Sequence, residues 1–218
     1  MRKLVRLVLL AAMCISATTC ALMTETRYDG PAVRVPDNST VFPNSFETVW
    51  ASAIASLTEK SFVLDTLSKD SRIITFSFSS LDPGEYLDCG QLTYINTGGI
   101  DGNGAKSIPG TAPMAELLVS TGMPRPAPAR RTARLEGKAN IIFSEEETRK
   151  TRVTVLARYV MSVRTETVAP GKVPYQKQGS VTLTTGQEGM HDGDEMTKCV
   201  SRYVLERTIL DDISEKLQ

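Results

Sequence analysis

The chain has 218 residues and balances 25 lysines and arginines against 25 aspartates and glutamates. This balance gives no sign of the basic patch or stripe that nucleic-acid binding proteins carry, so no nucleic-acid partner is expected. The length suffices for one domain with a hydrophobic core of its own.

The first residues have the three parts of an export signal. A basic stretch at residues 1–6 is followed by an apolar stretch, Leu7 to Ile15, and then by small residues from Ser16 onward. Even when it is extended to Met23, the apolar stretch is short and contains hydroxyl residues, whereas a membrane-spanning helix needs about 20 apolar residues. The sequence therefore predicts a cleaved signal peptide over residues 1–19.

Two cleavage sites fit this signal. One lies before Cys20, which would then carry a lipid anchor, and the other lies after Ala21, as for an ordinary exported protein. Residues 21–23 lack the aspartate associated with retention in the inner membrane. The first alternative thus predicts a lipoprotein on the periplasmic face of the outer membrane, and the second a periplasmic protein.

Two of the four cysteines, Cys89 and Cys199, lie well inside the mature chain. In an oxidising compartment such a pair favours a disulfide, and the alternative is two unrelated buried thiols. Because the two positions are far apart, a bond between them would close a long loop, worth about 4 to 5 kcal/mol at most. These cysteines and the single histidine, His191, are too few for a metal site, so no metal or cofactor is expected.

Residues 20–37 have little apolar periodicity and predict a flexible tether. Ser45 to Lys60 then has helical spacing, with Asn44 as the expected N-cap and Glu47 three residues later. One face of this helix is apolar and predicts core packing. It carries Phe46, Val49, Trp50, Ala53, Ile54 and Leu57.

Alternating polar and apolar residues predict five strands. The expected strands are Ser61 to Leu67, Ile74 to Phe78, Ala133 to Phe143, Val153 to Val163 and Gly179 to Thr185. The sequence "SEEETRK" at residues 144–150 predicts a hairpin turn, and Leu205 to Leu217 has the spacing of a closing amphipathic helix. Together these elements predict one α+β domain over residues 38–218, with both helices on one face of an antiparallel sheet.

A long stretch rich in glycine and proline, at about residues 95–130, interrupts this pattern. Connections of this length are functional or disordered, so we expect a mobile insertion. Within it, Met114, Leu117, Leu118 and Val119 predict a short helix that docks on a partner. The alternative is an unstructured insertion without a partner.

Two cysteine motifs carry a resemblance to known proteins. The sequences "YLDCG" at 86–90 and "CVSRYVLE" at 199–206 resemble segments of a group of Gram-negative envelope lipoproteins. The order of elements also resembles the helix-grip domains of BamC, the accessory lipoprotein of the outer-membrane barrel assembly machinery. The resemblance covers roughly residues 40–92 and 131–218. It implies a helix-grip-like fold, a bond between Cys89 and Cys199, and a scaffolding role in envelope assembly or secretion.

No sequence motif indicates catalysis. His191 lies in a glycine-rich segment that offers a general base little support, and this segment predicts a solvated loop. Asp192, Asp194 and Glu195 lack the spacing of a calcium-binding loop. We therefore expect a non-catalytic protein that binds other envelope proteins, with a lipid or small-ligand module using a helix-sheet pocket as the alternative.

Overall fold

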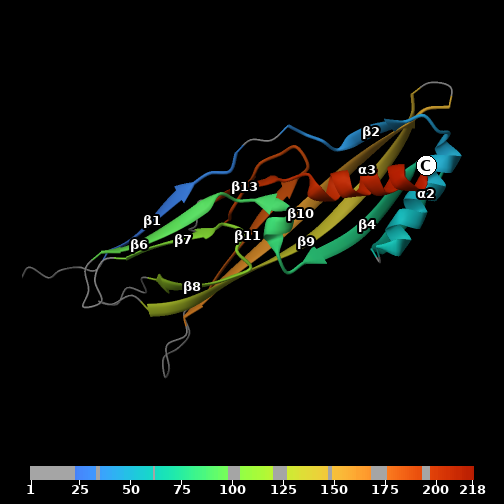
Figure 1. Cartoon of the computed structure of the whole chain (residues 1–218). Coiled ribbons are helices and arrows are strands. Elements are labelled where there is room, and N and C mark those ends of the chain that lie inside the picture. The colour runs from blue at the N-terminus through green and yellow to red at the C-terminus, as the bar shows by residue number, and fades with distance from the viewer. Residues whose placement is uncertain are drawn as a thin grey trace, which may run out of the picture.

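The computed structural model of the chain is an elongated molecule built on long strands, with two helices gathered toward one end (Figure 1). The structure describes residues 23–32, 35–60, 62–97, 104–119, 127–146, 149–167, 176–192 and 197–218. The elements are, in chain order, β1 (Met23–Asp29), β2 (Ser39–Phe42), α2 (Phe46–Glu59), β3 (Val63–Ser68), β4 (Ile73–Ser80), the 3-10 helix η1 (Pro83–Glu85), β5 (Leu87–Asp88), β6 (Gln91–Thr97), β7 (Gly104–Pro109), β8 (Met114–Val119), β9 (Ala127–Glu145), β10 (Thr151–Thr167), β11 (Gln176–Thr184), β12 (Gly189–Met190), β13 (Lys198–Ser201) and α3 (Val204–Lys216).

The predicted α+β helix-grip fold with a five-stranded sheet is wrong. Strands make up 59% of the described residues and form three sheets, the largest with seven strands. The error has a local cause, because residues 20–37 and 95–130 were expected to be loose chain. Instead, Met23–Asp29 forms β1, and the second stretch contributes β7, β8 and the start of β9.

The largest sheet is built around the hairpin of β9 and β10. Its strands are 19 and 17 residues long and pair in register from Thr151 opposite Glu145 to Thr167 opposite Ala129. At about 3.3 Å per residue, β9 extends for roughly 60 Å. The predicted alternation is confirmed here, since every second side chain of β9 and β10 from Ala139 to Phe143 and from Val153 to Val163 is buried.

The remaining strands of this sheet add to the two sides of the hairpin. β11 pairs with β10, while β4 pairs with β9 and β3 with β4, so the order is β11-β10-β9-β4-β3. β2 also pairs with β10, and β8 with β9. The expected strands Ser61 to Leu67 and Ile74 to Phe78 are present as the antiparallel pair β3 and β4, and β9 and β10 pair as strands on either side of the hairpin turn predicted at 144–150.

Both helices pack on one face of the large sheet and complete the main core. α2 buries Val49, Trp50, Ala53 and Leu57, and α3 buries Leu205, Ile209 and Ile213 against the same cluster as the strands. The first of them, α2, begins one residue later than predicted, because Ser45 rather than Asn44 is the N-cap. The Ser45 side chain makes no capping hydrogen bond.

A second, smaller core lies beyond the helices. The three-stranded sheet β1-β6-β7 turns Leu92, Tyr94 and Ile108 toward Ala115 and Leu117 of β8. These residues form a hydrophobic cluster separate from the main one. The hairpin of β9 and β10 thus joins two cores, one under the helices and one under the β1-β6-β7 sheet.

Candidate functional site: the disulfide junction and strand β8

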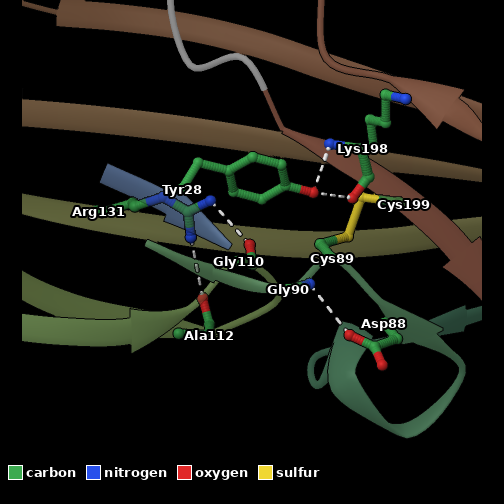
Figure 2. The surroundings of a disulfide bond; sticks show 9 residues. All are labelled: Tyr28, Asp88, Cys89, Gly90, Gly110, Ala112, Arg131, Lys198 and Cys199. Atoms are coloured by element: carbon green, nitrogen blue, oxygen red, sulfur yellow. Dashed lines mark hydrogen bonds between the residues drawn. A yellow bond between two sulfur atoms is a disulfide. The ribbon is translucent and has the colours of Figure 1, made fainter. Parts of the chain in front are cut away.

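Cys89 and Cys199 are joined where the three sheets meet (Figure 2). Cys89 follows β5 directly and Cys199 lies in β13, and both side chains are almost fully buried. Their sulfur atoms lie within disulfide-bonding distance, so the geometry of the predicted pair is confirmed. The bond spans 110 positions of the sequence and connects the middle of the chain to the strand that leads into α3.

The residues around Cys89 allow another part of the chain to approach the disulfide closely. Asp88 accepts a hydrogen bond from the backbone N–H of Gly90, which has a positive φ of 66°. Such a φ favours glycine, and a side chain here would also collide with the backbone of Asp29. A Cβ atom on Gly110 would lie 2.5 Å from the carbonyl oxygen of Cys89. The turn after β7 can therefore pack directly on the disulfide only because position 110 is glycine.

Arg131 fixes this turn from the other side. Its side chain is fully buried, and its guanidinium donates hydrogen bonds to the carbonyl oxygens of Gly110, at 2.8 Å, and Ala112, at 3.4 Å (Figure 2). A buried charge is tolerated when it is well hydrogen-bonded. Arg131 thereby ties β9 to the connection that leads into β8.

Tyr28 fastens β1 to the same junction. Its hydroxyl donates to the carbonyl oxygen of Lys198 and accepts from the backbone N–H of Lys198, both at 2.8 Å (Figure 2). Burial raises the pKa of the Tyr28 hydroxyl, and the hydrogen bond with the Lys198 backbone partly offsets this rise. One side chain thus satisfies both backbone groups of a β13 residue and holds the segment expected to be a tether.

The predicted partner-binding residues form strand β8 rather than a helix. Leu117 is buried in the small core and Val119 is half-buried against it. By contrast, Met114 is 64% exposed and Leu118 43% exposed. β8 pairs with β9 on one side, and on its other side Lys106 donates to the carbonyl oxygen of Glu116. Two of the four predicted residues are therefore available to a partner, and two hold the strand in place.

The segment around His191 is more ordered than the predicted solvated loop. Gly189–Met190 pairs with β13, and His191 forms a bridge with Val181. The imidazole ring occupies the space that a side chain at Gly179 would fill. Asp192 accepts hydrogen bonds from the backbone and the hydroxyl of Ser180, and these bonds lower the pKa of its carboxyl.

Three residues that the sequence analysis considers lie outside the described residues, namely Cys20, Asp194 and Glu195. Within the described ranges, no three acidic, histidine or cysteine side chains come together as metal ligands. The helices of the described chain are also too short or too polar to cross a membrane.

Aromatic side chains form two groups in the main core between the helices and the sheet. Phe46, Trp50 and Phe143 contact one another. The second group consists of Phe62, Phe76, Phe78, Tyr86 and Tyr159. An open depression of 560 Å³ lies at the margin of this interface, beside Lys60, Phe62 and Phe78. Another, of 610 Å³, lies on the polar side of the sheet near Arg134, Arg164 and Ser180.

Comparison with known proteins finds no matching family model, no matching curated protein and no matching solved structure.

Proposed function

We propose that the protein is a lipid-anchored component of the bacterial envelope, without catalytic activity, that binds another envelope protein through β8. The N-terminal signal ending at Cys20 supports the envelope location, and the buried Cys89–Cys199 pair suits an oxidising compartment.

One observation carries the interaction role: β8 is a fixed strand that exposes apolar side chains. Its inner side chains, Ala115 and Leu117, pack in the small core, and Arg131 and the disulfide hold the turn before it. Met114 and Leu118 nevertheless remain exposed on one face. A strand held in this way loses little conformational entropy on binding, which favours recognition by strand addition or by side-chain contact.

The alternative of a ligand pocket between helices and sheet has less support. Such a module needs an enclosed apolar cavity. Aromatic rings occupy that position, with centroids 4.7 to 6.3 Å apart. We therefore leave the lipid or small-ligand module aside.

The test compares two pairs of exposed residues in pull-downs from gently solubilised membranes. The double variant Met114→Ser, Leu118→Ser should lose a partner that the wild type recovers in stoichiometric amount. The matched control is Leu156→Ser, Met190→Ser, which removes two equally exposed apolar side chains from other strands. Equal recovery by both double variants would show that β8 is not the binding surface.

A further inference from the structure

The start of β1 lies very close to the proposed lipid attachment point. β1 begins at Met23, only three peptide units after Cys20. A chain of this length spans at most about 11 Å, even when it is fully extended. If Cys20 carries a lipid, as the proposed function holds, the first residue of β1 must lie within that distance of the anchored cysteine.

β1 cannot act as a spacer. All of its residues pair with β6, from Met23 opposite Thr97 to Asp29 opposite Gln91. The Tyr28 hydroxyl adds two hydrogen bonds to Lys198 at the interior end of the strand. Extending the anchor would require this strand to detach from the folded molecule, so the domain is expected to stay close to the membrane.

Other strand ends gather at the same end of the molecule as Met23. Thr97 ends β6, and Asn96 lies opposite Gly104 at the start of β7. β8 ends nearby, where Leu118 pairs with Pro128 of β9 (Figure 1). The helices lie toward the opposite end, where the hairpin of β9 and β10 turns. This arrangement defines a strand-end surface, formed by the ends of β1, β6 and β8 and the start of β7.

We propose that the strand-end surface rests on the lipid headgroups of the membrane and that the helices point away from it. The chemistry of the surface suits the headgroup layer rather than the hydrocarbon. Glu25 and Arg27 of β1 form an exposed ion pair, and Lys106 and Ser107 of β7 are exposed on the other side of β6. Ser144, near the turn of the long hairpin, is then roughly 55 Å along β9 from the end that faces the bilayer.

Tryptophan quenching by lipids with a spin label on the headgroup tests this orientation. Trp50 is the single tryptophan, so Trp50→Phe provides a silent background. Ala105→Trp and Glu25→Trp place a reporter at the strand-end surface, and Ser144→Trp places a matched reporter at the far end; all three positions are exposed. In vesicles holding the lipidated full-length protein, both near reporters should lose most of their emission and Ser144→Trp should keep it.

The outcomes separate the inference from the proposed function. Intact mass of each reconstituted sample establishes whether Cys20 carries lipid; an unlipidated native chain overturns the proposed function and this inference with it. With the lipid present, quenching of Ser144→Trp, equal quenching at both ends, or no quenching at either end overturns the orientation alone. Two near-end reporters are used so that misfolding of one, detected by denaturation, does not decide the result.

Discussion

At the scale of single residues, a few buried or half-buried polar side chains make hydrogen bonds between segments that are far apart in the sequence. Tyr28 satisfies both backbone groups of Lys198, and Arg131 satisfies two carbonyl groups before β8. Glu206, fully buried in the first turn of α3, accepts hydrogen bonds from the hydroxyls of Tyr159, at 2.9 Å, and Thr185, at 2.6 Å. Each of these groups is therefore expected to contribute separately to stability.

Tyr28→Phe should lower the free energy of unfolding by about 1 kcal/mol, because it removes the hydroxyl that pairs with both Lys198 backbone groups. Urea denaturation measures this loss. No loss would show that solvent replaces the hydroxyl at no cost.

Tyr28 should also make the stability of the protein depend on pH in the alkaline range. Because the pKa of Tyr28 is raised in the folded state, its contribution is complete below the unfolded pKa of about 10. It is lost as the pH rises through the higher folded pKa, since a phenolate cannot donate to the Lys198 carbonyl. Wild type should therefore lose stability more steeply above pH ~10 than Tyr28→Phe, measured by denaturation at each pH, and parallel profiles would contradict this.

Glu206→Ala should cost about 2 to 3 kcal/mol, because the hydroxyls of Tyr159 and Thr185 lose their buried acceptor. Glu206→Gln is the matched control and should cost less, since its amide keeps one acceptor oxygen. Denaturant midpoints of the two variants give the comparison. Equal midpoints would mean that the acceptor oxygens contribute nothing beyond side-chain packing.

At the scale of elements, Arg131 and the disulfide hold the turn that precedes β8 and so fix the position of this strand. The two leucines of β8 provide an internal comparison because they are neighbours with opposite burial. Leu117 is 5% exposed and Leu118 43% exposed. Stability and binding should therefore separate between them.

Leu117→Ala should lower the free energy of unfolding by about 2 to 3 kcal/mol, because it opens a cavity in the small core. Leu118→Ala should change it by no more than about 0.5 kcal/mol, as is usual for surface positions. Thermal or chemical denaturation of both variants checks the difference. The burial assignment for β8 fails if Leu118→Ala is as costly as Leu117→Ala.

Removing the disulfide with Cys89→Ala, Cys199→Ala should cost up to about 4 to 5 kcal/mol, since the bond closes a loop of 110 positions. The double variant avoids leaving a free thiol. Its unfolding midpoint should match that of the reduced wild type, and both should lie below that of the oxidised protein. Coincident oxidised and reduced midpoints would contradict a stabilising bond.

The elements that the sequence predicts well are those with their own periodicity. α2, α3, β9 and β10 each carry an apolar repeat, and the two cysteines that lie beyond the predicted signal are enough to suggest their pairing. β1, β7 and β8 were missed because their stability comes from distant strands: β1 pairs with β6, and β8 depends on Arg131 of β9. Arg131 itself could have been found, since the alternation of β9 extended backwards from Ala133 puts it on the buried face.

At the scale of the whole molecule, the long β9–β10 hairpin separates the end that we propose lies at the membrane from the end that carries the helices. The end with β1 and β8 would lie at the membrane and meet a partner there, while the helices close the main core at a distance. A partner that binds Met114 and Leu118 would thus be embedded in the membrane or attached to it. The proposed orientation at the membrane depends on a lipid anchor at Cys20.

The most direct test is the intact mass of the native protein purified from membranes without reductant. The account predicts a chain that begins at Cys20, carries acyl chains on that residue, and gains the mass of two hydrogens when Cys89 and Cys199 are reduced. A chain that still begins at Met1, with both cysteines as free thiols, would contradict the envelope location, the anchor and the disulfide together.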